Sequence, residues 1–250
     1  MKRRVIKCFL TVAVLCGLWE LASRIPKYSI FIPSPLKVAG VFASNKSFDL
    51  LLPTITTLVV VLGCLTVGTL IGYTVGCAIG LSSRSKAVLY FPTTILKSVP
   101  ISVFLPVFMA ACGLDYYVYP MLCLPVAAMV AVNIANAVLE MPSERAFQRR
   151  VLNLTAFEYL KDIAFWETLE CFFATLRIAG PFCLTLQVAL DYFLHANGGL
   201  GTYISNQYQS VTYPEMYAAI MIVCAFGFLL LLSVDQLSRR LQRWRTRILN

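Results

Sequence analysis

Histidine, charge and catalytic signatures are scarce in this chain. It has one histidine, His195, and only 13% of its 250 residues are charged, about half the share in an ordinary soluble domain. Its nine cysteines form no Cys-x-x-Cys pair, and the sequence contains neither a Walker P-loop nor a Gly-x-Ser-x-Gly element. These shortages argue against a metal site, a nucleotide site and an intramembrane enzyme built on a nucleophile–base pair.

Apolar residues are abundant instead. They make up 59% of the chain, and the mean hydropathy is +0.76. A run of about twenty apolar residues is long enough to cross the roughly 30 Å of hydrocarbon in a bilayer. We therefore expect an all-α integral membrane protein, a single domain over residues 1–250, with a polar loop over 140–171. The predicted spans are 5–22, 54–81, 90–112, 116–139, 172–194 and 216–234.

The net charge of +9 is distributed as in a multi-pass membrane protein. Lysine and arginine are enriched in cytoplasmic segments, and most of them here lie in segments that six crossings would put on one side. We therefore expect both termini and the 140–171 loop in the cytoplasm, with no nucleic-acid partner. Four basic residues that follow the first span run against the pattern: Arg24, Lys27, Lys37 and Lys46.

The first predicted span has a second interpretation. Basic residues followed by a short apolar run are also typical of a secretory signal peptide. Trp19 and Glu20 interrupt the end of this run, and no clean small-x-small cleavage site follows it. We expect a retained helix, because its removal would leave an odd number of crossings.

A short helix is predicted after the first span. Ile32-Pro33-Ser34-Pro35 is typical of an extended elbow, because residues before proline avoid the helical region. Ser34 is then placed to cap a helix over 36–42, with Pro35 at its first position.

Four glycines recur at every fourth position of the second span: Gly68, Gly72, Gly76 and Gly80. On a helix they form a stripe without side chains, against which another backbone can approach closely. Two interpretations remain open. The stripe is either a surface on which helices slide or dimerise, or simple tight packing within one bundle.

The loop after the fourth span is the polar part of the chain. Pro142-Ser143-Glu144 is typical of a helix start, and Asn153 suits the left-handed conformation that ends a helix. Thr155 and Glu158 fit a capping box for a second helix. The charged residues of the segment from residue 140 to residue 177 are Glu140, Glu144, Arg145, Arg149, Arg150, Glu158, Lys161, Asp162, Glu167, Glu170 and Arg177.

The first helix of this loop, 143–152, is amphipathic. Phe147, Val151 and Leu154 fall at i, i+4 and i+7 and form an apolar stripe opposite Arg145 and Arg149. A cytoplasmic helix this short needs another surface for its stability. That surface is either a groove on a partner protein or the inner ends of the chain's own bundle.

The order of these features resembles the permease subunits of binding-protein-dependent ABC importers, most closely the nitrate/sulfonate/taurine branch. The similar segments run along nearly the whole chain. They are Ile32-Pro33-Ser34-Pro35, Gly80-Leu81-Ser82, Leu96-Lys97-Ser98-Val99-Pro100, Cys112-Gly113-Leu114-Asp115, Leu176-Arg177-Ile178-Ala179, Gly199-Leu200-Gly201 and Arg239-Arg240.

The resemblance implies that the polar loop carries the family's EAA motif, a helix-turn-helix that docks into an ATPase subunit. Phe147-Gln148-Arg149 stands where the family has Glu-Ala-Ala, and Leu152-Asn153 where it has Leu-Gly. Phe165-Trp166 replaces a Leu-Pro pair. The residues implied in ATPase coupling are therefore Phe147, Gln148, Arg149, Val151, Leu152, Asn153 and Leu154.

The resemblance also implies the assembly and its location. We expect a type I importer permease in a bacterial inner membrane, working as a homodimer with a second permease subunit. Its partners would be a cytoplasmic ABC ATPase dimer and an external solute-binding protein. ATP and Mg²⁺ would bind to the ATPase, and this chain would carry no cofactor. It would translocate a small polar solute, for which an oxyanion, a sulfonate and a thiamine-precursor pyrimidine are all open.

Ionisable and proline residues inside the spans are candidates for the translocation path or its gate. Asp191 aligns with an acidic residue common in the branch, and a carboxylate within a membrane normally faces protein or water. Pro100 and Pro106 interrupt the third span. Lys97 and Arg177 are expected near the inner boundary, where long side chains reach water.

Two other function classes remain as alternatives to the importer permease. One is a passive channel or a membrane anchor for another protein, which the polar loop does not exclude. The other is an intramembrane enzyme, for which His195 is the only candidate base.

Overall fold

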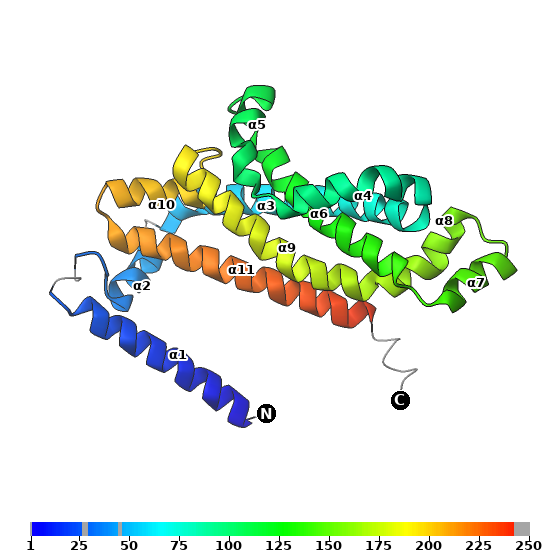
Figure 1. Cartoon of the computed structure of the whole chain (residues 1–250). Helices are drawn as coiled ribbons and strands as arrows, with labels where there is room; N and C mark the ends of the chain where they lie inside the picture. Colours follow the sequence, from blue (N-terminus) through cyan, green and yellow to red (C-terminus); the bar gives the residue numbers. More distant parts are fainter. Residues whose placement is uncertain (1, 27–29, 45–46, 243–250) are drawn as a thin grey trace. The chain divides into compact units, whose positions relative to one another are not determined.

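The computed structural model describes residues 2–26, 30–44 and 47–242, and every regular element within them is a helix (Figure 1). The chain divides into two compact units. The first comprises residues 1–57 and 188–225, and the second comprises residues 58–187 and 226–250. Three long helices, α3 (Ser47–Leu81), α9 (Phe165–Leu194) and α11 (Tyr213–Leu241), contribute residues to both units.

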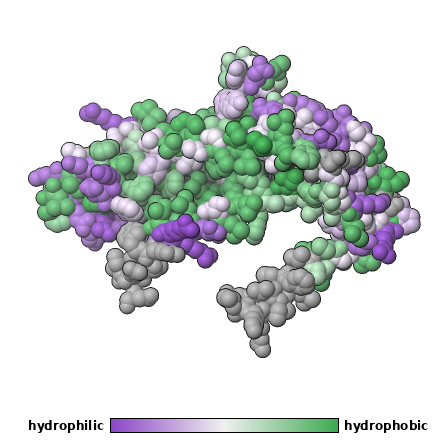
Figure 2. Space-filling view, turned by 180° about the vertical axis from the view of Figure 1, so that it is seen from behind, coloured by the Kyte–Doolittle hydropathy of each residue, from purple (hydrophilic) through white to green (hydrophobic). Residues whose placement is uncertain are grey.

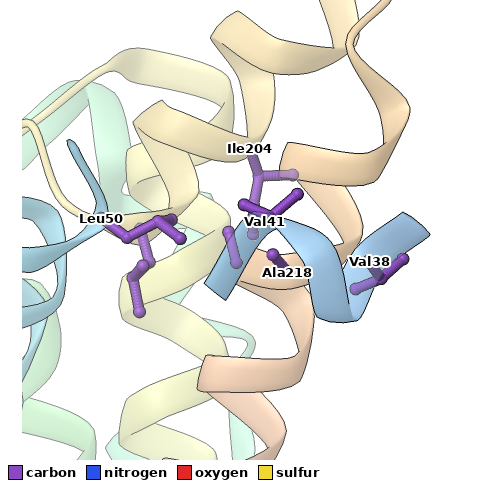
Figure 3. Close-up of a cluster of buried hydrophobic side chains, with 7 residues drawn as sticks. Val38, Val41, Leu50, Ile204 and Ala218 are labelled. Carbon is purple, nitrogen blue, oxygen red and sulfur yellow. The ribbon is translucent and has the colours of Figure 1, made fainter. Parts of the chain in front are cut away.

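The first unit contains α1 (Lys2–Ser23), α2 (Pro35–Ala43) and α10 (Leu200–Gln209). The predicted short helix is confirmed as α2, because the Ser34 side chain accepts a hydrogen bond from the Lys37 backbone N–H at 3.4 Å. Figure 3 shows Val38 and Val41 of α2 together with Ile204 and Ala218 in one cluster of buried side chains. The core of this unit is Val38, Val41, Leu50, Leu200, Ile204, Ala218 and Ala219.

The second unit is built around α6 (Val118–Leu139), most of whose residues are buried. Besides parts of α3, α9 and α11, it contains several shorter elements. They are α4 (Ser83–Ser98), the 3-10 helix η1 (Ile101–Phe104), α5 (Leu105–Cys112), α7 (Ser143–Val151), α8 (Ala156–Tyr159) and the π-helix η2 (Leu160–Ala164). The polar loop and the glycine stripe therefore belong to one unit.

In the part of the chain that the structure describes, four helices are long and apolar enough to cross a membrane: Phe48–Leu81, Val118–Leu139, Phe157–Leu194 and Tyr213–Leu241. They correspond to the second, fourth, fifth and sixth predicted spans. Helix α1 covers the first predicted span and contributes the apolar stretch Ala13–Ser23. The number of crossings, six, stays a prediction.

The third predicted span is bent rather than straight. Ser83–Ser98 and Ile101–Cys112 meet at 99°, with Val99 and Pro100 at the break. Helix α4 also begins earlier than expected, because the Ser82 hydroxyl accepts a hydrogen bond from the Ser85 N–H at 3.3 Å. Arg84 and Lys86, which precede the predicted span over 90–112, consequently lie in the first turn of α4.

Apolar residues face outward on several helices. The most apolar windows of α3 and α11 are only 28% and 17% buried within the chain. Figure 2 shows hydrophobic side chains over much of the face in view. Apolar surface this extensive is rare in soluble proteins, and it suits contact with lipid or with another subunit.

Candidate functional site

Helix α7 and the turn after it form the first part of the candidate site. The helix ends at Val151, one residue before the predicted end, and Asn153 adopts a positive φ of 49°. Asparagine tolerates this left-handed conformation better than most residues, since its short polar side chain bonds locally. The predicted turn at Asn153 is therefore confirmed.

The predicted capping box follows this turn. The Thr155 N–H donates to Glu158 Oε2 at 2.8 Å, and the Glu158 N–H donates to Thr155 Oγ1 at 3.3 Å. These two bonds satisfy backbone donors at a helix start. The helix that begins here does not stay short, because α8 continues through the π-helix η2 into α9. The second helix of the loop is thus the first part of the fifth long helix.

The apolar stripe of α7 is mostly uncovered. Phe147 is 66% exposed and Val151 is 60% exposed, while Leu154 is half-buried. Leu152, in the turn, is 62% exposed. Within this chain, Phe147 and Val151 therefore do not pack against the bundle. The backbone of Arg149 belongs to α7, and its side chain lies outside the described residues.

The polar side of α7 is held to α9. Arg145 forms a salt bridge with Glu167, at 2.6 Å between Nη2 and Oε1, and its Nη1 donates to Gln148 Oε1 at 3.1 Å. A cavity of about 440 Å³ lies beside this pair, and Trp166 and Asp162 contribute to its wall. The ion pair orients α7 on the unit and leaves its apolar stripe outward.

The glycine stripe of α3 packs on α6 of the same chain. A Cβ atom built on Gly68, Gly72 or Gly76 would lie 2.5–2.8 Å from a backbone carbonyl oxygen of α6. On Gly80 it would lie 2.5 Å from Val138 Cβ. Real Cβ atoms do not approach so closely, so the two helices touch backbone to backbone at Gly68, Gly72 and Gly76, and Gly80 packs on the Val138 side chain. Of the two interpretations, this geometry is that of tight packing within one bundle.

Pro100 and Pro106 lie on either side of the 3-10 helix η1. Pro100 is its N-cap residue, at the 99° break, and Pro106 lies in the first turn of α5. Proline lacks the N–H that would continue a helix, which explains why α4 ends here. Both prolines are exposed within the chain.

Lys97, in the last turn of α4, anchors a line of polar side chains in the second unit. Its Nζ donates to Asn133 Oδ1 at 2.8 Å. Asn133 Nδ2 donates to Thr175 Oγ1 at 3.0 Å, and that hydroxyl donates to the Cys171 carbonyl at 2.8 Å. The line joins α4, α6 and α9. Sequence reasoning missed Asn133 and Thr175, although an asparagine within an apolar span was a visible signal.

Asp191 is fully buried in the first unit, where α9 ends. Its Oδ1 accepts a hydrogen bond from the Asn197 N–H at 3.2 Å, and its backbone carbonyl accepts from His195 N and from Thr202 Oγ1. The structure thus places Asp191 in the packing of the α9–α10 connection. Its role in a gate stays a prediction.

The Gly199-Leu200-Gly201 segment makes this close packing possible. A side chain on Gly199 would collide with the Asp191 carboxylate and with Thr57 Oγ1. The same threonine hydroxyl accepts a hydrogen bond from the Leu200 N–H at 2.9 Å, at the start of α10. One side chain of α3 therefore caps α10, in a space that only glycine leaves open.

Comparison with known proteins identifies the family. A family model described as "Binding-protein-dependent transport system inner membrane component" matches residues 68–247. The chain belongs to this family. It is 25% identical over 192 residues to the bicarbonate transport system permease protein CmpB of Synechococcus elongatus. The aligned region covers 76% of this chain and 68% of that protein. The same protein from a second Synechococcus strain matches to the same extent.

The fold agrees with this membership. The permease superposes on a chain of the MetNI methionine ABC transporter, in inward-facing conformations, with a TM-score of 0.65. The match covers 79% of this chain and 99% of that chain at 21% identity, so it shows the fold alone. The expected all-α fold of an ABC importer permease is thereby confirmed, and the chain is a membrane-embedded transport subunit.

Proposed function

We propose that two copies of this permease enclose a translocation path for a small polar solute in a bacterial inner membrane. A cytoplasmic ATPase dimer docks on α7 of each copy, and an external solute-binding protein delivers the solute. ATP and Mg²⁺ bind to the ATPase and not to this chain, which has no enzymatic activity of its own. Both termini face the cytoplasm.

The exposed apolar stripe of α7 carries this proposal. Phe147 and Val151 are more than half exposed, although each would contribute about 1.5–3 kcal/mol if fully buried. The turn at Asn153 and the Arg145–Glu167 ion pair hold the stripe in one orientation. An ordered helix that presents apolar side chains to water is typical of a surface that enters a groove on a partner.

Alternating access follows from this arrangement. Closure of the ATPase dimer would push the two α7 helices together. Because the backbones of α3 and α6 touch along the glycine stripe, these two helices would move as one body and transmit the displacement. Among the candidate solutes, the relative named for bicarbonate transport favours an oxyanion.

Crosslinking tests the docking surface. A Val151→Cys variant should form a disulfide-linked adduct with a cysteine placed in the groove of the co-expressed ATPase. Leu114→Cys is the matched control, because Leu114 is 68% exposed in the same unit but is expected on the outer side. The native chain, with its own nine cysteines, measures the background.

A second readout separates the importer from a passive channel or an anchor. Uptake that continues when no ATPase co-purifies or crosslinks would overturn the proposal. Equal crosslinking of the Val151→Cys and Leu114→Cys variants would also contradict it, since the two positions are expected on opposite sides of the membrane.

A further inference from the structure

The break between α4 and η1 opens a cavity of about 420 Å³ in the second unit. Its size falls within the range of small-molecule sites, roughly 300–1,000 Å³. The wall comes from α4, the break, η1, α6 and α9. The lining residues are Leu96, Lys97, Ser98, Val99, Pro100, Ile101, Ser102, Pro125, Met129, Phe182 and Leu186.

Among the described residues that line this cavity, Lys97 is the one charged residue, and none of them carries a carboxylate. The rest of the wall is mostly apolar, with Ser98 and Ser102 adding hydroxyl groups. Lys97 is itself exposed within the chain, so a ligand that enters the cavity can reach its ammonium group. The cavity therefore favours an anion over a cation or a neutral solute.

The Lys97 side chain is held in one orientation by a hydrogen bond, but not all of its N–H donors are used. An ammonium group carries three N–H donors, and Asn133 Oδ1 accepts one of them at 2.8 Å. Within the described part of the chain, Lys97 forms no other side-chain hydrogen bond and no ion pair. Two donors are thus left for a ligand, while Asn133 and Thr175 hold the side chain in position.

A purely structural role for Lys97, as a positive charge at the end of α4, explains fewer of these observations. A lysine in the last turn of a helix complements the negative end of the helix dipole. That role needs only a positive charge near the carbonyl groups of α4. It does not explain a bond to Asn133 on a different helix, or the lack of a carboxylate among the described residues that line the cavity.

We propose that the α4–η1 cavity binds a small oxyanion through the ammonium group of Lys97 and the hydroxyl of Ser102. Because the cavity would lie on the translocation path, this inference rests on the proposed function, and it adds the place and the residues that would bind the solute. Lys97 would counter the charge of the anion as it passes the break in the third span.

Chloride-35 NMR on the purified full-length permease in neutral-lipid nanodiscs tests the site. Chloride serves as the reporter anion, because rapid exchange with a protein site broadens its line. We expect excess line width with the native chain, removed by added bicarbonate or nitrate. The Lys97→Gln variant should lose most of this displaceable broadening, and the Lys97→Arg variant should retain it.

Two further variants control for charge and folding. Lys86→Gln removes a positive charge from the exposed first turn of the same helix, outside the cavity, and should leave the broadening unchanged. Ser102→Asp places a carboxylate in the cavity, keeps the Lys97–Asn133–Thr175 line and should abolish the broadening. Ser102 is exposed, so this substitution tests the site even if the Lys97→Gln variant fails to fold.

Displaceable broadening that is absent from the native chain, or unchanged by Lys97→Gln and Ser102→Asp, would overturn the anion site. An equal loss with Lys86→Gln would do the same, because it would reveal a general effect of net charge. The measurement needs no ATPase. A negative NMR result would therefore contradict the anion site alone. The proposed docking of the ATPase on α7 is tested separately, by crosslinking of the Val151→Cys variant.

Discussion

In the second unit, α3 carries a stripe of glycines on one face and α7 carries a stripe of large apolar residues on one face. The first stripe is covered by another helix and the second is exposed. The glycines of α3 lie against the backbone of α6, so closely that no Cβ atom fits. The apolar side chains of α7 at Phe147 and Val151 are uncovered. The stripe of small residues is covered inside this chain, whereas the large apolar residues Phe147 and Val151 are mostly exposed.

The difference shows that a stripe on a helix wheel indicates a contact but not its location. Glycines allow backbones to meet, and packing between the helices then provides the attraction. The large apolar side chains of α7, Phe147 and Val151, are mostly exposed within this unit. Substitutions in the glycine stripe of α3 should therefore lower the stability of the protein, whereas substitutions in the apolar stripe of α7 should weaken partner binding.

The largest effect is expected at Gly72. In the Gly72→Ala variant the new Cβ would lie 2.5 Å from the Ala127 carbonyl oxygen and 2.7 Å from Val130 Cβ. Neither atom can move without its backbone, so unfolding in mixed detergent micelles should become easier by about 3 kcal/mol or more. The larger Gly72→Leu and Gly76→Leu changes should abolish uptake.

Gly63 provides the matched control on the same helix. Outside its own stretch of helix, no atom of the described residues lies within 4 Å of a Cβ built there, so the Gly63→Ala variant should unfold like the native chain. Equal losses of stability for Gly63→Ala and Gly72→Ala would show that the α3–α6 contact is not decisive.

A smaller effect is expected at Gly180 on α9. The atom that a Cβ would meet is the Leu230 Cδ2 methyl, the end of a flexible side chain. Because this methyl can rotate away, the Gly180→Ala variant should lose only about 1 kcal/mol of unfolding free energy. Chemical unfolding alongside Gly72→Ala checks the order, and a reversed order would mean that backbone contact does not set the cost.

Substitution of Arg177 should change the unfolding free energy still less. Its Nε donates to Asp235 Oδ1 at 2.6 Å, and the two side chains are 41% and 40% exposed. Exposed ion pairs contribute about 0.2–1 kcal/mol, so the Arg177→Gln variant should fall within that range. A double-mutant cycle with Asp235→Asn isolates the pair, and a coupling energy well above this range would assign it a larger role than we expect.

The smallest effect on stability is expected on α7. The Phe147→Ser variant removes a side chain that is 66% exposed, so the unfolding free energy should change by less than about 0.5 kcal/mol. The ATPase should nevertheless no longer co-purify, because an anchor of the docking surface is lost. Normal co-purification together with unchanged stability would mean that this stripe is not the contact.

Local features of the site could be predicted from neighbouring residues. Ser34 as the cap of α2, Asn153 in the left-handed turn and the Thr155–Glu158 capping box were all predicted, and all are observed. Each depends on residues within a few positions of one another. The fifth span was predicted to begin at residue 172, but the helix that follows Thr155 runs into it without a break, and the π-helix that joins α8 to α9 has no clear signal in the sequence.

Long-range features could not be predicted in the same way. The sequence showed that Lys97 and two prolines interrupt the third span, but not the 99° bend or the cavity beside it. Asn133 and Thr175 are 36 and 78 positions from Lys97, and only the packing of α4, α6 and α9 brings the three together.

The sequence by itself determined the class of protein, its helices and their caps, because hydrophobic runs, prolines and capping residues act over short distances. Tertiary structure alone decided which stripe is covered, where the polar line of Lys97 lies and that Asp191 is enclosed. The physical reason is that a covered surface needs a second element to cover it. Which element does so depends on how the whole bundle packs.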